Sequence, residues 1–402
     1  MKIESILECI NIEEIFNTIV DLEGPKYPLN NMVELNLACD YIVNKLTSYG
    51  IRTEVQEFYV KGFDEPFKNV IGWIGDFTKP AIVLGSHYDT VENSPGANDN
   101  LSAVAVSLEA ARILSMMENP PTTIIAVFTL EEEHPGLYKA IKDKLHSLGI
   151  MDKNHRFTSA KMFNFAKKIS RLSYKRRQAD KPIYEVFQDI FDELKDKLDH
   201  DELALIQTYI DEFKEFFPDS LNYQSLYIVG SAKFVEKVQS ENIQISNIIN
   251  FDCIGWINNH KYTQKPLPLS EQILPYLSLY KTNLNDSVGN FIGIMGEINS
   301  KPMLDEFVKH CGNEGVDIPH LGLYLPLDYK GILRMSPDIL RSDHASFWRA
   351  GIPGIFISDT ANFRSDFYHT PGDTYNHINY EALGKINEAT IRTLVSYNNI
   401  KK

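Results

Sequence analysis

Apolar and polar residues alternate along the first part of the chain in a pattern that predicts a helix followed by strands. Residues 33–50 carry apolar side chains on one helical stripe, and Gly50 stands where a helix commonly ends. Runs of β-type residues follow at 53–60, 69–74 and 81–85, and the last run is apolar almost throughout. A strand of that composition is covered on both faces. We therefore expect a helix packed on a sheet that buries residues 81–85.

The alternation of strand and helix continues further along the chain. Residues 101–114 predict a helix that Asn100 or Ser102 could cap, and residues 122–130 predict another buried strand. Later segments repeat the pattern, with helices at 231–238, 302–310, 344–351 and 380–398, and strands at 245–252, 290–296 and 352–358. Repeated units of this kind predict an α/β fold, in which a mainly parallel, mixed central sheet has helices on both faces. Such sheets bind ligands beyond the carboxyl ends of their strands.

Residues 137–223 interrupt this alternation because they contain no convincing strand. Amphipathic stripes predict a first helix that ends at Gly149, a second over 183–198 and a third over 203–217. We interpret 137–223 as a helical insertion within one domain of residues 1–402. The second half of the insertion is acidic and its first half is basic, so attraction between the two would favour packing of these helices against one another. The basic run is most simply a solvated helix face, with a binding role as the alternative: Lys167, Lys168, Arg171, Lys175, Arg176 and Arg177.

Composition and charge narrow the classes of partner and the location. The net charge is −14 and no basic tract is long, so nucleic acid is not an expected partner. No span reaches the roughly 20 apolar residues that cross a bilayer, so we expect no membrane partner. Glutamates interrupt the first residues where a signal peptide would be apolar. A cytoplasmic protein is also favoured by its four scattered cysteines, Cys9, Cys39, Cys253 and Cys311.

Five short segments place acids and histidines at the ends of predicted strands. Because the carboxyl ends of parallel strands meet at one rim of a sheet, we expect these side chains to converge there. Buried acids need compensation, and a metal would supply it. The segments are GSHYDT (85–90), GANDN (96–100), FTLEEE (128–133), NFDCIG (250–255) and FYHTPGDT (367–374).

The residue types in these segments suit zinc. Zinc binds neutral imidazole and carboxylate oxygen, and two-metal hydrolases hold their ions about 3.5–4 Å apart. Two histidines and three acids would leave a nearly neutral site around two Zn²⁺ ions and one hydroxide. Cobalt or manganese can replace zinc in carboxylate-rich sites. Asp89 stands two residues after His87, so a strand-like period puts both on one side, where Asp89 would orient the imidazole.

Both the motifs and their flanks resemble the co-catalytic dizinc aminopeptidases, a family related to bacterial leucyl aminopeptidases and more distantly to glutaminyl cyclases. Apart from residues 137–223, nearly the whole chain takes part. The resemblance implies a zinc-exopeptidase fold, also called phosphorylase/hydrolase-like, and removal of single residues from the free amino end of peptide substrates. The similar segments are ACDYIVNKLTSYGIRTEVQEF, NVIGWIG, IVLGSHYDTV, SDHASFWRAGIPGIFISD and FYHTPGDT.

The resemblance also implies a role for each matching residue. Glu131 would be the general base for a water bridged between two zinc ions, and Tyr368 would either donate to the developing oxyanion or only pack. The peptide bond between Asp99 and Asn100 would be cis. His344 would cap its helix or touch the substrate. The metal ligands would be His87, Asp99, Glu132, Asp252 and His369, with Asp99 bridging both ions.

Two departures from the family leave alternatives open. The three consecutive acids also allow Glu132 and Glu133 to be base and ligand, although alignment on FTLEE favours Glu131 and Glu132. The insertion begins beside the site and could cap it, so the side-chain preference stays open. A related zinc carboxypeptidase or N-acyl amino acid deacylase uses the same order of ligands, but residues 252–369 leave little room for the lid of such enzymes. A binding protein with a vestigial site is the alternative outside catalysis.

Overall fold

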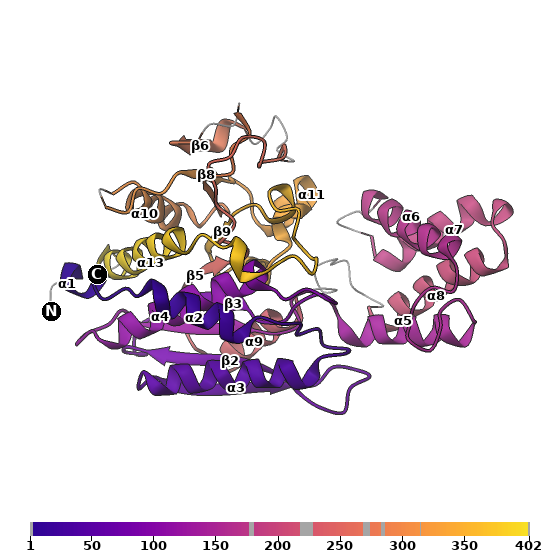
Figure 1. Cartoon of the computed structure of the whole chain (residues 1–402), viewed down its shortest axis with the longest axis horizontal. Coiled ribbons are helices and arrows are strands. Elements are labelled where there is room, and N and C mark those ends of the chain that lie inside the picture. Colours follow the sequence, from indigo (N-terminus) through magenta and orange to yellow (C-terminus); the bar gives the residue numbers. More distant parts are fainter. Residues whose placement is uncertain are drawn as a thin grey trace.

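A mixed β-sheet forms the centre of the chain (Figure 1). The computed structural model describes residues 3–176, 181–217, 228–267, 274–282, 286–313 and 315–400, and every element named below lies in these ranges. The strand order is β1-β2-β4-β3-β5-β9-β7-β8-β6. The strands are β1 (Arg52–Phe58), β2 (Phe67–Ile74), β3 (Ala81–His87), β4 (Thr123–Phe128), β5 (Ile245–Phe251), β6 (Leu277–Tyr280), β7 (Ile292–Gly296), β8 (His320–Tyr324) and β9 (Gly354–Ser358).

The parallel part of the sheet is its middle. β4, β3, β5 and β9 run parallel to one another, and β7 runs parallel to β8. The remaining pairs, β1 with β2, β2 with β4, β7 with β9 and β6 with β8, are antiparallel. The sheet is therefore mixed, with less parallel pairing than the sequence pattern suggested. The four parallel strands present their carboxyl ends at one rim.

Helices cover both faces of the sheet. One face packs against α3 (Met32–Ser48), α4 (Ser102–Ser115), α10 (Lys301–Cys311) and α13 (Tyr380–Ile400), and α2 (Ile12–Leu22) lies over α4 and α13. The other face packs against α9 (Val229–Ser240) and α12 (His344–Arg349). The short helices α1 (Ile3–Leu7) and α11 (Tyr329–Met335) lie at the periphery. This is the layered α/β architecture that the sequence predicts.

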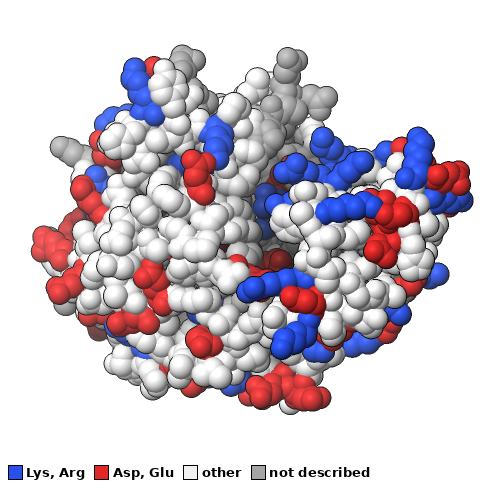
Figure 2. Space-filling model, turned by 45° about the vertical axis from the view of Figure 1, so that its right-hand side comes forward, with Lys and Arg blue, Asp and Glu red and all other residues white. Residues whose placement is uncertain are grey.

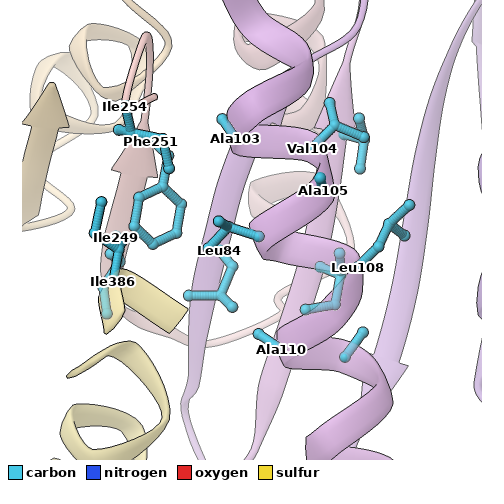
Figure 3. Packing of buried hydrophobic residues seen from close by; sticks show 14 of the residues in the cluster. Leu84, Ala103, Val104, Ala105, Leu108, Ala110, Ile249, Phe251, Ile254 and Ile386 are labelled. Atoms are coloured by element: carbon cyan, nitrogen blue, oxygen red, sulfur yellow. The ribbon is translucent and has the colours of Figure 1, made fainter. Parts of the chain in front are cut away.

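Small side chains let α4 approach the sheet closely. Figure 3 shows Ala103, Ala105 and Ala110 on the helix, with Leu84 of β3 and Phe251 of β5 packed beside it. All are buried almost completely. Neither Asn100 nor Ser102 caps the helix, because residues Ala97–Leu101 form a separate π-helical turn that leads into it. That prediction was wrong, and the turn carries one of the candidate metal ligands.

The helices of residues 135–216 form a body beside the sheet (Figure 1). They enclose a hydrophobic cluster of their own, distinct from the cores on the two faces of the sheet. Ion pairs join the basic α6 to the acidic helices: Arg176 lies 2.6 Å from Glu193, and Lys161 lies 3.4 Å from Glu202. Residues 218–223 of the predicted insertion lie outside the described residues. The helices are α5 (Pro135–Ser147), α6 (Ala160–Arg176), α7 (Ile183–Leu194) and α8 (His200–Phe216).

Among the described residues, no helix combines the length and the apolar character that a membrane crossing requires.

Candidate metal centre

Each predicted metal ligand follows a strand of the parallel group. His87 is the last residue of β3, and Asp99 lies in the π-helical turn before α4. Glu132 follows β4, Asp252 comes directly after β5, and His369 lies in the loop beyond β9. Because these strands are parallel neighbours, their carboxyl ends bring five residues that are far apart in sequence to one rim.

Asp99 lies at the centre of the group. Its Oδ1 is 3.6 Å from Nε2 of His87, and its Oδ2 is 3.1 Å from Nε2 of His369. Nε2 of His369 also lies 3.2 Å from Oε2 of Glu132. His87, Asp99 and Glu132 offer ligand atoms within 4.8 Å of one another, and so do Asp99, Asp252 and the neighbouring Cys253. Asp99 thus belongs to two overlapping sets of ligand atoms.

The backbone around Asp99 is held from two sides. The peptide bond between Asp99 and Asn100 is cis, as the resemblance implied. The Asp373 carboxylate accepts hydrogen bonds from the backbone N–H of Asn98 at 2.9 Å and of Asp99 at 3.0 Å. The Asn100 side chain donates to the carbonyl of Phe251 at the end of β5. These bonds fix the position of Asp99 relative to both the His369 loop and β5.

Asp89 lies behind His87 and also holds the acidic loop. One of its carboxylate oxygens is 3.5 Å from Nδ1 of His87, and its backbone carbonyl is 3.3 Å from the same nitrogen. Its Oδ2 accepts hydrogen bonds from the backbone N–H of Glu131 at 3.0 Å and of Glu132 at 3.3 Å. Asp89 therefore lies where it can orient the imidazole, and it also joins β3 to the loop after β4.

The three consecutive acids point to three different partners. Glu132 faces His369, whereas Glu133 accepts a hydrogen bond from the hydroxyl of Tyr27 at 2.9 Å. Glu131 is buried and accepts hydrogen bonds from the backbone N–H and, at 3.0 Å, from the hydroxyl of Ser231 in the first turn of α9. Glu132 therefore lies among the candidate ligands, whereas Glu131 is held by α9 and Glu133 by Tyr27.

Comparison with known proteins identifies the family. The sequence model of peptidase family M28 matches residues 69–210 and 332–394, which together make up just over half of the chain. The chain belongs to peptidase family M28. Among its relatives is the uncharacterized protein YfbL of Escherichia coli, which is 22% identical over 393 residues, 95% of this chain and 87% of YfbL. A probable zinc metalloprotease of Leptosphaeria maculans is 28% identical over 35% of this chain and 38% of its own length.

Solved structures show the same fold at low sequence identity. The LapA aminopeptidase of Legionella pneumophila has a TM-score of 0.55 and 16% identity over 98% of this chain and 72% of LapA. The glutaminyl cyclase of Porphyromonas gingivalis also has a TM-score of 0.55, with 15% identity over 96% of this chain and 99% of the cyclase. The M28 chain is therefore a metallopeptidase of the zinc-dependent type with an α/β fold.

The donor atoms of this M28 peptidase fit a cation. Oδ2 of Asp99 and Nε2 of His369 are buried and have no hydrogen-bond partner among the described residues, although they lie 3.1 Å apart. Burial, and then the charge of Glu132, raises the pKa of Asp99; burial and then Asp99 raise the pKa of Asp252. Burial opposes protonation of His369, but Glu132 and Asp99 outweigh it and raise its pKa to about 10. Zinc binds imidazole nitrogens and carboxylate oxygens, and its positive charge would offset the excess of buried negative charge at this site.

Asp343 is a buried acid of the site that the sequence analysis did not single out. Burial, followed by the adjacent Asp343 carboxyl, raises the pKa of Glu131 well above its ordinary value. Burial also raises the pKa of Asp343. The two neighbouring buried carboxyl groups disfavour each other's charged form. The quoted segment SDHASF contains Asp343, but its distance in sequence from Glu131 gave no indication of the contact.

His344 and Tyr368 lie near the centre in different surroundings. The ring of His344 is fully buried, donates from Nε2 to the carbonyl oxygen of Ile339 at 2.8 Å, and stacks on Phe356. Tyr368 stacks on His369, with ring centroids 3.8 Å apart, and its hydroxyl lies 3.4 Å from Nη2 of Arg341. His344 thus belongs to the core, and the Tyr368 hydroxyl has a cationic neighbour.

A cavity of about 130 Å³ opens beside the candidate ligands. Asp252 and Tyr368 line it, and Asp338 and Arg341 are among its few charged lining residues. Most of its wall is apolar, which suits an uncharged side chain better than a polar one. The apolar lining residues are Leu267, Met295, Leu321, Leu323, Ile339, Phe356 and Phe363.

Proposed function

We propose that this M28 peptidase is an aminopeptidase that holds two zinc ions and uses Glu131 as its general base. The observation that carries the proposal is the position of Asp99, which belongs to two sets of ligand atoms at once. His87 and Glu132 complete one set, and Asp252 lies in the other. His369 adds an imidazole 3.1 Å from Asp99. A carboxylate shared in this way is suited to bridge two ions about 3.5–4 Å apart.

Bound zinc would polarise the substrate carbonyl and lower the pKa of a water molecule. Glu131 offers a carboxyl group that the ligand contacts leave free, next to Glu132 in sequence. Ser231 fixes both of its oxygens, so the carboxyl is aimed rather than mobile. Burial and Asp343 raise the pKa of Glu131, which makes its carboxylate a stronger base, and it would take a proton from the attacking water and return it to the departing amine.

The apolar cavity supports a preference for a large uncharged residue at the amino end of the peptide. Asp252, a candidate ligand, and Tyr368 line it, so a side chain in it would belong to the residue whose carbonyl lies at the ligands. The Tyr368 hydroxyl would donate to the oxyanion that forms during hydrolysis. We therefore expect leucine or phenylalanine anilides to be better substrates than aspartate or lysine anilides.

The decisive experiment compares Glu131→Gln with Glu133→Gln. Glutamine is nearly the same size in both positions but cannot take a proton, so Glu131→Gln should keep its zinc and lose at least about a hundredfold in kcat. Glu133→Gln should retain both zinc and kcat within a few fold, since Glu133 only accepts a hydrogen bond from Tyr27. Zinc is counted by metal analysis of the same preparations. Full activity in Glu131→Gln refutes the assignment of the base.

Three further substrates separate the related activities. An aminopeptidase hydrolyses leucine anilide but not its N-acetylated form, whereas a carboxypeptidase or deacylase acts on N-acylated substrates that end in a free carboxylate. A glutaminyl cyclase converts a peptide that begins with glutamine without cleaving it. The retention of both His87 and Asp252 favours hydrolysis over cyclisation in this chain, because both serve as ligands in the two-zinc arrangement. A preparation that binds zinc but acts on none of these substrates would indicate a binding protein.

A further inference from the structure

The insertion is attached directly to the loop that carries Glu132. Its first helix, α5, begins at Pro135, and Lys142 of α5 lies 3.4 Å from the hydroxyl of Tyr27, the same hydroxyl that donates to Glu133. The His134 ring caps α5 and packs edge-on against Phe216 and Phe217 at the end of α8. Both ends of the insertion are thereby held next to the candidate metal centre.

A hollow separates the insertion from the rest of the molecule (Figure 2). Acidic side chains lie at its floor, and lysine and arginine side chains gather on the insertion where it borders the hollow. They lie over the part of the insertion where Figure 1 places α6, its most basic helix. The floor of the hollow is therefore acidic, and its border with the insertion is basic.

Three basic residues of α6 form one stripe, which we call the basic stripe: Lys168, Arg171 and Lys175. Their spacing of three and four residues puts them on one side of the helix. All three are exposed, whereas Phe165 and Ile169 of the same helix are buried in the insertion core. None of the three forms an ion pair with a described residue, whereas the basic residues Lys161 and Arg176 at the ends of α6 do.

We propose that the basic stripe binds carboxylate groups of the peptide substrate whose amino end lies at the metal centre. The proposal rests on the aminopeptidase function proposed above and names its substrate class, peptides that carry a carboxylate a few residues beyond the cleaved bond. A free peptide is positive at one end and negative at the other, and the hollow has acids at its floor and bases at its border. This polarity orients the peptide with its amino group inward. The carboxylate comes from the carboxyl terminus of a short peptide or from an acidic side chain.

The effect should appear in KM rather than in kcat, because the stripe is remote from the reacting atoms. Exposed ion pairs are individually weak, so three charges that act together should lower KM about three- to tenfold. Exposed charges are screened by salt, and the advantage should therefore shrink between 20 mM and 500 mM NaCl.

The test is the triple variant Lys168→Gln/Arg171→Gln/Lys175→Gln in the full-length, zinc-loaded protein. The matched control is Lys281→Gln/Lys301→Gln/Lys309→Gln, which removes the same number of positive charges. Lys301 and Lys309 lie on α10, and all three side chains are more than half exposed. Leucine anilide, which has no carboxylate, reports the proposed function by itself. It should be hydrolysed equally by the wild type and both variants. Failure of every protein on this substrate would refute the aminopeptidase and not the stripe.

Two pairs of peptides identify the source of the carboxylate. Leu-Gly-Gly is compared with its carboxyl-terminal amide, and Leu-Gly-Glu-amide is compared with Leu-Gly-Gln-amide. We expect KM for at least one charged member to rise three- to tenfold in the stripe variant alone, with kcat and the uncharged member unchanged. Equal KM values for charged and uncharged members in the wild type, or an equal change in the control variant, overturn the proposal. Loss of binding of a labelled oligonucleotide in the stripe variant, without any peptide effect, would overturn it in favour of nucleic acid.

Discussion

An added methyl group at Gly230 tests whether the N-terminus of α9 positions Glu131. Gly230 lies just before Ser231, whose backbone N–H and hydroxyl both donate to the Glu131 carboxylate. A Cβ atom at this position would lie 2.1 Å from the carbonyl oxygen of Thr129, 2.6 Å from Oδ1 of Asn69 and 2.9 Å from Oε1 of Glu131. The first of these atoms belongs to the backbone next to β4 and cannot rotate away.

The size of the expected effect follows from that distance. Ordinary contacts of a Cβ atom begin at 3.4 Å, so the first turn of α9 and the Thr129 backbone must separate by roughly 1 Å. Such overpacking costs about 1–3 kcal/mol of unfolding free energy. With an unfolding entropy of about 2.1 cal/mol/K per residue, the melting temperature should fall by about 1–4 °C. A displacement of about 1 Å at a reacting group commonly lowers the rate about a hundredfold.

The assay therefore measures three quantities on Gly230→Ala. We expect kcat on leucine anilide to fall about a hundredfold, the melting temperature to fall slightly, and the zinc content to stay unchanged, since no metal ligand touches Gly230. Gly312→Ala is the matched control, because its Cβ would have no neighbour closer than 3.7 Å and its backbone is α-helical. Wild-type kcat in Gly230→Ala would show that the contact between α9 and Glu131 does not aim the base.

Two further predictions concern the support of the site and its surroundings. Asp373→Ala removes the acceptor of the Asn98 and Asp99 backbone N–H groups, so zinc affinity should fall about 10- to 100-fold in a competition titration with a chelator; unchanged affinity would contradict the role of Asp373. Burial lowers the pKa of His344 to about 3, below the ordinary 6.5, so the unfolded chain binds its proton first and stability is lost as pH falls below 6.5. His344→Gln should reduce the slope of unfolding free energy against pH by up to about 1.4 kcal/mol per pH unit between pH 4 and 6, measured by urea titration; an identical slope would refute a neutral, buried ring.

The main elements of the fold could be predicted because their residues are buried on regular patterns. The runs at 81–85 and 122–130 are apolar because β3 and β4 are covered on both faces, and both are strands in the structure. Two strands, β6 and β8, were missed. β6 has four residues, two of them exposed, and β8 has five with a glycine in the middle, so neither shows an extended pattern. The direction of each strand relative to its neighbours could not be predicted either, because it depends on pairings between distant segments.

The candidate ligands were predictable for a different reason. Each lies at the carboxyl end of a parallel strand or in the segment that follows it, and parallel strands bring their carboxyl ends together whatever the intervening segments are. The contacts of Glu131 were not predictable from such local patterns. Ser231 and Asp343 reach it from α9 and from the turn before α12, and only the packing of these helices on the same face of the sheet makes the contact. The turn at 97–101, in which Asn100 had been interpreted as a possible helix cap, was not predicted for the same reason, since Asp373 stabilises it from 274 residues away.

The position of Glu133 links motion of the insertion to the chemistry of the neighbouring acids. Glu133 is tied through Tyr27 to Lys142, and the next residues begin α5. A force on the helices α5 to α8, such as that from a long peptide bound in the hollow, would therefore reach Glu132 through only two intervening residues, Glu133 and His134. Peptide length would then be sensed as a change in ligand geometry, so that turnover and metal retention vary together among substrates of different length.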